Sequence, residues 1–236
     1  MTDSLPVVHD ERMESGPTRF KDLCLDALDV RAVAPFWAGA LGLEVEYRDG
    51  DAVLRGPEEG QALWLNTVPD PKTTKDRVHL DLHTDSIETL VGLGATIAPV
   101  QDDADRWTVL LDPEGNELCG FVRERDPMPA YKAYEMVVDS ADPVRIGQWW
   151  ADVLGVELHH EDGKDWTWLE SVPGFPMEGW VFGLVPEPKT VKNRLHWDVY
   201  GDVAELEASG ATRLWDMPRW TVLADPEGNE FCVFPH

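Results

Sequence analysis

The chain has 236 residues, 43% of them hydrophobic, which is enough to bury one large core or two ordinary ones. Its 20 lysine and arginine residues face 45 aspartate and glutamate residues, and the resulting net charge of −25 excludes nucleic acid and membrane surfaces as expected partners. The three cysteines lie inside apolar runs, which indicates reduced thiols and a cytoplasmic protein.

The N-terminal segment, residues 1–19, contains acidic residues and prolines where a signal peptide would need a basic start and an apolar stretch. We expect it to be a flexible tail. No later run approaches the ~18 to 20 apolar residues that a membrane-spanning helix needs.

The first predicted strand is FKDLCLDAL, residues 20–28, and Asp29 follows it in the position of a helix N-cap. Apolar residues then recur at helical spacing until Gly42, which is placed to end the helix. Short strands are predicted at residues 43–48, 52–56 and 62–68.

A second cycle with the same order begins at a predicted strand over residues 77–84. A helix is expected from about Ser86 to Leu93, stopped by Gly94, and the segment RWTVLLDPEGNELCGF then gives two strands joined by a PEGN turn. The predicted unit is one strand, one helix and three strands, repeated twice.

The second half of the chain repeats the first in the same order. RWTVLADPEGNEFCVF at residues 219–234 copies the segment at 106–121, and VPEPKTVKNRLHWDV at 185–199 copies VPDPKTTKDRVHLDL at 68–82. We therefore predict a tail at 1–19, one domain at 20–124, a linker at 125–132 and a second domain at 133–236.

These motifs resemble the vicinal oxygen chelate superfamily, which includes glyoxalase I, bleomycin-resistance proteins and extradiol dioxygenases, and more narrowly its glyoxalase-like branch. The resemblance implies an α+β fold of tandem βαβββ modules, two per domain, with curved mixed sheets around a pocket and helices outside. It also implies a divalent metal that binds two neighbouring oxygens of a substrate and stabilises the developing negative charge.

The family's metal ligands can be placed by position in this sequence. The first-strand positions are Asp22 and Glu135, the histidine positions are His79 and His196, and the last-strand glutamate positions hold Cys119 and Cys232. A thiol in place of the glutamate favours Zn²⁺ over Mn²⁺ or Fe²⁺ if a metal binds.

The grouping of these residues depends on how the modules pair, and the sequence leaves both arrangements open. If each domain closes its own site, Asp22 meets His79 and Cys119. If the halves cross over, as in dimeric glyoxalase I, Asp22 instead meets His196 and Cys232, and Glu135 meets His79 and Cys119. We expect no resident cofactor, with a divalent metal as the alternative.

Two kinds of side chain are expected to act on a ligand without metal. His79 and His196 are candidates for general acid-base catalysis, because an unperturbed histidine titrates near neutral pH. Ligand-binding residues are predicted in the tryptophan-rich second half, with a second aromatic core as the alternative. They are Trp166, Trp168, Trp180 and Trp197, with Asn66 from the first half.

Two copies of a basic loop carry six of the 20 cationic residues, Lys72, Lys75, Arg77, Lys189, Lys192 and Arg194. They are suited either to attract an anionic group to the cavity or to neutralise nearby carboxylates.

The sequence thus predicts a cytoplasmic protein of the glyoxalase and bleomycin-resistance type that binds a small organic molecule, by sequestration or with metal-free acid-base chemistry. The alternative is a metal-dependent lyase, isomerase or extradiol-type dioxygenase with altered ligands. A third possibility is that the first half is only a structural partner of the second. We expect a monomer built as a covalent pseudo-dimer, or a homodimer.

Overall fold

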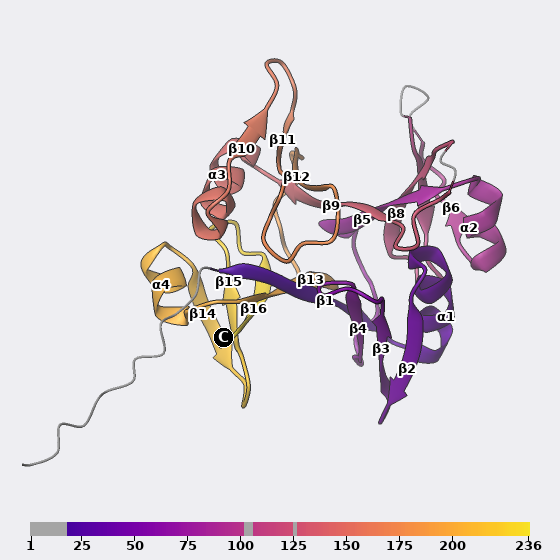
Figure 1. Cartoon of the computed structure of the whole chain (residues 1–236), viewed down its shortest axis with the longest axis horizontal. Helices are drawn as coiled ribbons and strands as arrows, with labels where there is room; N and C mark the ends of the chain where they lie inside the picture. The colour runs from indigo at the N-terminus through magenta and orange to yellow at the C-terminus, as the bar shows by residue number, and fades with distance from the viewer. Residues whose placement is uncertain (1–17, 102–105, 125–126) are drawn as a thin grey trace, which may run out of the picture.

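The computed structural model describes residues 18–101, 106–124 and 127–236, which form two eight-stranded sheets and four helices (Figure 1). The predicted tail lies outside the described residues up to position 17, as do residues 125–126 of the predicted linker. Within the described ranges, no helix has the length and apolar character needed to cross a lipid bilayer.

The first half consists of two modules whose elements follow the predicted order. The first module comprises β1 (Arg19–Ala27), α1 (Val30–Leu41), β2 (Glu44–Arg48), β3 (Asp51–Arg55) and β4 (Ala62–Thr67). The second comprises β5 (Val78–Thr84), α2 (Ile87–Leu93), β6 (Thr96–Ile97), β7 (Thr108–Leu111) and β8 (Glu117–Val122). The predicted caps of α1 are confirmed, because the Asp29 side chain accepts from two backbone amides of the first turn and Gly42 has a φ of 76°.

The second half repeats this order. Its first module comprises β9 (Ala133–Ser140), α3 (Pro143–Leu154), β10 (Leu158–His160), β11 (Trp166–Leu169) and β12 (Gly179–Leu184). Its second comprises β13 (Leu195–Tyr200), α4 (Val203–Ala208), β14 (Thr212–Asp216), β15 (Thr221–Ala224) and β16 (Glu230–Phe234). The α+β fold of four βαβββ modules is therefore confirmed.

The sheets join modules from opposite halves. Sheet A has the strand order β14-β15-β16-β13-β1-β4-β3-β2, and sheet B has the order β10-β11-β12-β9-β5-β8-β7-β6. At the junctions β1 pairs antiparallel with β13, and β5 pairs antiparallel with β9. Sheet A thus combines the first and last modules of the chain, and the halves are crossed over.

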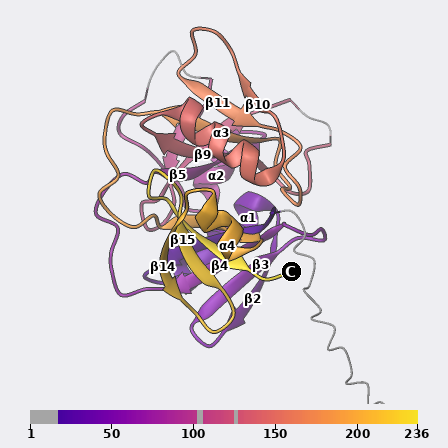
Figure 2. The same cartoon turned by 90° about the vertical axis from the view of Figure 1, so that its left-hand side faces the viewer.

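The hydrophobic core is continuous across the two halves, since the ring of Phe20 on β1 lies 5.0 Å from that of Phe175 in the second half. In the second half the fully buried Trp150 of α3 packs on Trp180 of sheet B at 5.0 Å and on Trp197 of sheet A at 5.4 Å between ring centroids. Figure 2 shows α3 and α4 stacked on the side of the second half. In the second half, α3 therefore connects the two sheets through its ring contacts. The opposite, concave face of each sheet is formed by strands of both halves.

The repeated PEGN segment has a structural role that explains its duplication. The buried Asp112 before the turn accepts hydrogen bonds from the Trp37 indole at 2.9 Å and from the Asn116 side chain at 2.8 Å. Glu114 accepts from the backbone amides that precede α1, and Glu227 does the same before α3. The segment therefore fastens the second module of each half to the helix of its first.

The two basic loops hold the halves together. Lys75 from the first half pairs with Asp139 of β9, and Lys192 from the second half pairs with Asp26 of β1 at 2.6 Å. Arg77 also donates to the Glu187 carbonyl at 2.6 Å across the junction. These contacts show that the basic loops neutralise nearby carboxylates, which is the second of the two roles predicted for them.

Candidate functional site

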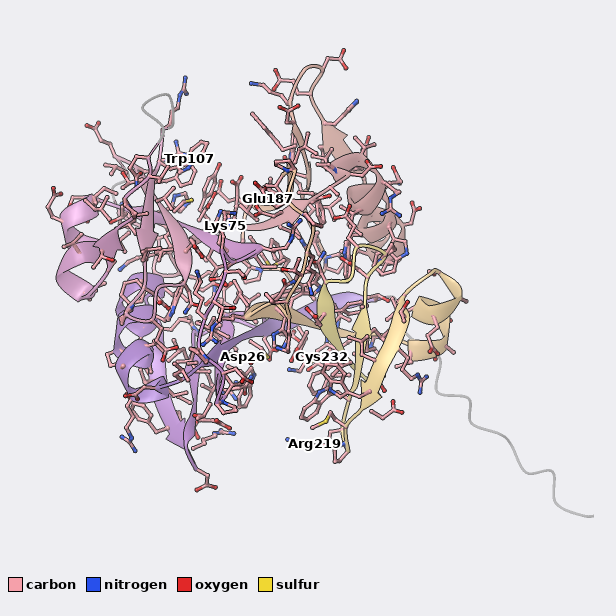
Figure 3. All side chains as sticks on the ribbon, turned by 180° about the vertical axis from the view of Figure 1, so that it is seen from behind. Asp26, Lys75, Trp107, Glu187, Arg219 and Cys232 are labelled. Atoms are coloured by element: carbon pink, nitrogen blue, oxygen red, sulfur yellow. The ribbon has the colours of Figure 1, made fainter. Side chains whose placement is uncertain are left out.

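A cavity of about 1910 Å³ opens on the concave face of sheet A and extends to the two crossing loops. Figure 3 shows its extent through five labelled lining residues: Asp26 of β1 and Cys232 of β16 lie on the sheet, Lys75 and Glu187 belong to the loops, and Arg219 lies beyond β14. Because β1 and β16 come from opposite halves, the cavity exists only in the crossed arrangement.

The sheet side of this cavity carries an ion-paired cluster. The Lys21 amine donates to Asp22 Oδ2 at 2.6 Å and to Asp198 Oδ2 at 3.4 Å, and the Trp64 indole donates to Asp22 Oδ2 at 3.0 Å. Both carboxylates are at least 94% buried, since Asp22 is 6% and Asp198 3% exposed. One ammonium group thus contacts both buried carboxyl groups and supplies the opposite charge that a buried carboxylate requires.

Two thiols and an imidazole complete the cluster. Cys24 Sγ lies 3.6 Å from Asp198 Oδ1, within the range of a weak sulfur hydrogen bond, and Cys232 pairs with Asp198 in the β13–β16 register. His196 lies opposite Cys24 between β1 and β13 and is 7% exposed, and its Nδ1 has no hydrogen-bond partner among the described residues. This buried nitrogen is available to a ligand.

Burial sets the protonation states of the cluster. It raises the pKa of Asp198 to about 8, with repulsion from Asp22 as the second cause, and it lowers the pKa of His196 to about 3, with Lys192 adding to the effect. Burial also lowers the pKa of Lys21, but attraction to Asp22 and Asp198 outweighs it and the net pKa is raised. Near pH 7, Asp198 is therefore mostly protonated, His196 is neutral and Lys21 is charged.

The native thiols are expected to be unreactive. Burial raises the pKa of Cys24 well above its ordinary value and also raises that of Cys232, with Asp198 contributing in both cases, and all three cysteines are buried and outside disulfides. We expect Ellman's reagent at pH 8 to modify the folded protein at least about 100-fold more slowly than the unfolded chain, in which all three thiols are accessible. Rapid modification of one native thiol would contradict this burial.

The wall of the cavity is aromatic and its charges are balanced. The rings come from four strands and one loop of sheet A: Trp64, Tyr200, Trp215, Trp220 and Phe234. Eight of the 20 lysine and arginine residues also line the cavity, in a chain whose net charge is −25. This lining suits a flat organic molecule and admits a negatively charged one.

The four tryptophans predicted to bind a ligand are not among the residues lining this cavity. Trp180 and Trp197 are 0% exposed and their ring centroids lie 5.0 Å apart in the core, so the prediction of a pocket role is corrected for both. Trp166 and Trp168 lie on β11 of sheet B, away from sheet A, because the crossover separates β11 from β13. Asn66, in contrast, does line the cavity.

Sheet B carries the counterpart of the cluster. His79, Asp81 and Cys119 have potential ligand atoms within 4.8 Å of one another, as do Cys24, His196 and Asp198 on sheet A. Glu135 of β9 lies opposite Asp81 in the β5–β9 ladder, and burial, with repulsion from Asp81, raises the pKa of Glu135 to about 7. The predicted catalytic His79 therefore lies on a different sheet from the large cavity.

The crossover decides which predicted ligands meet. Asp22 lies next to Asp198 and so joins His196 and Cys232 on sheet A, which excludes its grouping with His79 and Cys119 on sheet B. The sequence interpretation missed Cys24, Asp81, Asp198 and Lys21. Asp81 and Asp198 follow the histidines by two residues on the same strand face, and this alternation was a usable signal.

Comparisons with known proteins place the chain among glyoxalase-like folds. Glyoxalase I from Zea mays superposes with a TM-score of 0.65 at 13% identity, covering 92% of each chain. A putative dioxygenase from Bacillus subtilis subsp. subtilis str. 168 superposes with a TM-score of 0.63 at 14% identity, covering 92% of this chain and 84% of that one. At these identities the likeness concerns the fold alone.

The CppA protein from Streptococcus pneumoniae TIGR4 superposes with a TM-score of 0.52 at 11% identity, covering 94% of this chain and 100% of that one. A sequence search of curated proteins finds no match. The glyoxalase-like domain family, however, matches residues 22–121 and again residues 135–234. The chain therefore belongs to the glyoxalase-like domain family, within the vicinal oxygen chelate superfamily, and carries two copies of the domain in tandem.

Proposed function

We propose that this protein binds a small, flat organic molecule in the sheet A cavity and transfers a proton on it without a metal. The observation that carries the proposal is the large cavity with an aromatic wall and a buried Lys21–Asp22–Asp198 cluster on its sheet side. Sequestration of the ligand would use the same cavity without the proton transfer.

The sheet A residues are poorly suited to bind the divalent metal that the family resemblance implies. Cys24, His196 and Asp198 are close enough to offer three ligand atoms. The Lys21 ammonium, however, lies 2.6 Å from Asp22 and 3.4 Å from Asp198, and a divalent ion beside it would be repelled in a site of low dielectric constant. The metal-dependent alternative is therefore not proposed for this cavity, and no step is derived through a metal.

The cluster supports proton transfer through Asp198. A carboxyl group whose pKa lies near 8 holds a proton at neutral pH and can return to the carboxylate within one reaction cycle. Lys21 would stabilise the carboxylate after proton release, and the buried His196 Nδ1 would accept a hydrogen bond from the ligand. Because its pKa is about 3, His196 is assigned to ligand positioning and not to the proton transfer for which it was first selected.

Ligand binding can be tested by filling the cavity with a larger side chain. Val222 lines the cavity on β15, and Val109 is its counterpart on β7 of sheet B. We expect Val222→Phe to weaken binding of the fluorescent dye anilinonaphthalene sulfonate by about 10-fold or more, the equivalent of ~1.4 kcal/mol, and Val109→Phe to leave it unchanged. Equal dye affinity in both variants would remove the pocket assignment.

Proton transfer can be tested with a ligand found by dye displacement. Nuclear magnetic resonance would follow exchange of its acidic carbon-bound hydrogen for solvent deuterium. We expect Asp198→Asn to slow this exchange by about 10²–10⁴-fold while the affinity changes little, because the variant keeps the shape of the side chain and loses the acid-base group. Unchanged exchange in Asp198→Asn would contradict the proposed role.

The proposal includes a cytoplasmic location, supported by three buried cysteines that form no disulfide, and a monomeric state. A monomer is supported by the completion of both sheets within one chain, which forms a covalent pseudo-dimer. Light scattering after size exclusion should then give a mass near 26.5 kDa, whereas a homodimer would give twice that value.

A further inference from the structure

The two basic loops, residues 68–77 and 185–194, differ at one buried position, which is Asp76 in the first loop and Asn193 in the second. The backbone is placed alike at both positions. The amide of each residue donates to the glutamate that begins the last strand of its half, at 3.0 Å for Asp76 and 3.1 Å for Asn193. The first half therefore holds a buried carboxyl group where the second half holds a neutral side-chain amide.

The second half shows what a hydrogen-bond donor at this position does. The Asn193 side-chain amide donates to Asn229 Oδ1 at 3.0 Å and so ties the loop to the PEGN turn. In the first half the Asn116 side chain donates to Asp112 at 2.8 Å, which leaves Asn116 Oδ1 as an acceptor. This oxygen is buried and has no hydrogen-bond partner among the described residues. The first half thus has the acceptor of the bond without a permanent donor.

A protonated Asp76 is the donor that this acceptor needs. A buried acceptor without a donor costs free energy, and a neutral carboxyl group can supply the missing hydrogen. Burial raises the pKa of Asp76 to about 7 against the attraction of Lys72, and repulsion from Glu117 adds to the rise. Burial also raises the pKa of Glu117, but hydrogen bonds from Lys72 and the Asp76 amide outweigh it and the net pKa is lowered. The proton therefore resides on Asp76.

The charged groups around Asp76 make its ionised form unfavourable. Lys72 lies 2.8 Å from Glu117 and 3.9 Å from Asp76, so one ammonium group would face two carboxylates. Lys75 donates to the Asp76 carbonyl at 3.4 Å, but its charge is paired with Asp139 of the other half. Ionisation of Asp76 therefore removes a donor and adds a repelled charge at the point where the loop is attached.

We propose that Asp76 is a proton-dependent switch of the first basic loop. When protonated, its carboxyl group donates to Asn116 Oδ1 and holds the loop on the PEGN turn, and when ionised it releases the loop. Asp76, Lys75 and Arg77 line the sheet A cavity, with Lys75 on the loop side in Figure 3, so the release loosens one wall of the cavity. The second loop keeps its donor at every pH because it has Asn193. The switch does not rest on the proposed function, since it concerns the loop and not the ligand.

Hydrogen exchange of single backbone amides measures the switch in the wild-type protein. Nuclear magnetic resonance would follow the exchange at pH 6 and pH 8, with correction for the intrinsic rate. We expect protection of the Asp76 amide to fall by at least about 5-fold, because with a pKa of about 7 the protonated fraction falls about 10-fold over this range. Protection of the Asn193 amide, which makes the equivalent hydrogen bond, should change by less than about 2-fold. Equal changes at both amides, or none at either, would overturn the proposal.

Exchange of the two residues between the loops tests the cause. Asp76→Asn copies the second loop into the first, and we expect it to make protection of the first loop independent of pH. Asn193→Asp is the reciprocal variant and should give the second loop the pH dependence of the first. If one variant does not fold, the other variant and the wild-type comparison still decide. An Asp76→Asn variant that keeps the wild-type pH dependence would refute the role of Asp76.

The coupling of the loop to the cavity is measured with anilinonaphthalene sulfonate at pH 6 and pH 8. From the lower to the higher pH, we expect the dye affinity of the wild-type protein to fall about 3- to 10-fold more than that of Asp76→Asn, because the fraction with a fastened loop falls. This comparison cancels the effect of Asp198, which titrates in the same range. The same pH dependence in both proteins would contradict the coupling. Absence of dye binding would remove the proposed function, while the amide measurement decides on the switch.

Discussion

Trp150→Ala is expected to lower the free energy of unfolding by about 3–5 kcal/mol, the range for removal of a buried tryptophan from a core. The indole is 0% exposed and contacts the rings of Trp180, Trp197 and Phe231 at centroid distances of 5.0 to 5.4 Å. It also donates to Asp225 at 3.2 Å, so the substitution leaves a cavity and an unpaired carboxylate.

The measurement is urea unfolding followed by far-ultraviolet circular dichroism. Trp166→Ala is the control, because this indole is 43% exposed on β11 and its removal should cost less than about 0.5 kcal/mol. Since Trp150 contacts strands of both sheets, its loss should reduce the stability of the second half as a whole. Equal midpoints for the two variants would show that the ring cluster contributes little to the fold.

Lys21→Met should destabilise the protein by about 3–5 kcal/mol at pH 9, because it leaves two buried carboxylates without their cation. The pH dependence follows from the raised pKa of Asp198, about 8 in the folded state against ~3.9 in an unfolded chain. The folded state then holds a proton that the unfolded chain releases, so the contribution of this group to stability falls as pH rises from about 4 to 8.

The destabilisation caused by Lys21→Met should therefore be smaller at pH 5, where Asp198 is protonated and needs no neighbouring cation. Thermal unfolding of wild type and variant at pH 5, 7 and 9 measures this trend. The double variant Lys21→Met/Asp198→Asn should recover much of the loss at pH 9, because the two residues are coupled. A cost that is independent of pH would assign Lys21 to packing alone.

Much of the local structure follows from short-range signals. Asp29 and Gly42 bound α1 because a carboxylate can accept from the free amides of a first turn and glycine tolerates a φ of 76°. The duplicated PEGN segment predicted a hairpin turn, and the alternation between helical and strand periodicity predicted the order of strand, helix and three strands. The roles of Asp112 and Glu114 in fastening the modules required the tertiary contacts.

The site was only partly accessible from the sequence, as two residues illustrate. Strand alternation places Lys21 and Asp22 on opposite faces of β1, yet the register shifts between Phe20 and Asp22 and the two side chains hydrogen bond at 2.6 Å. Trp197 was expected near a pocket, but it alternates with His196 and Asp198 and so faces the core. A bulge and the choice of sheet face both depend on contacts with distant strands.

The sequence by itself determined the duplication, the module order and the candidate residues His79, His196, Cys119 and Cys232, because these depend on local patterns and on position within a repeat. Only the tertiary structure decided that β1 pairs with β13, and so that Asp22 meets Asp198. Strand pairing between segments more than 150 residues apart leaves no local pattern, since either partner strand would satisfy the same edge hydrogen bonds. The crossover therefore determines which residues form the site, and the contacts of Lys21 with Asp22 and Asp198 place a cation beside its two buried carboxyl groups.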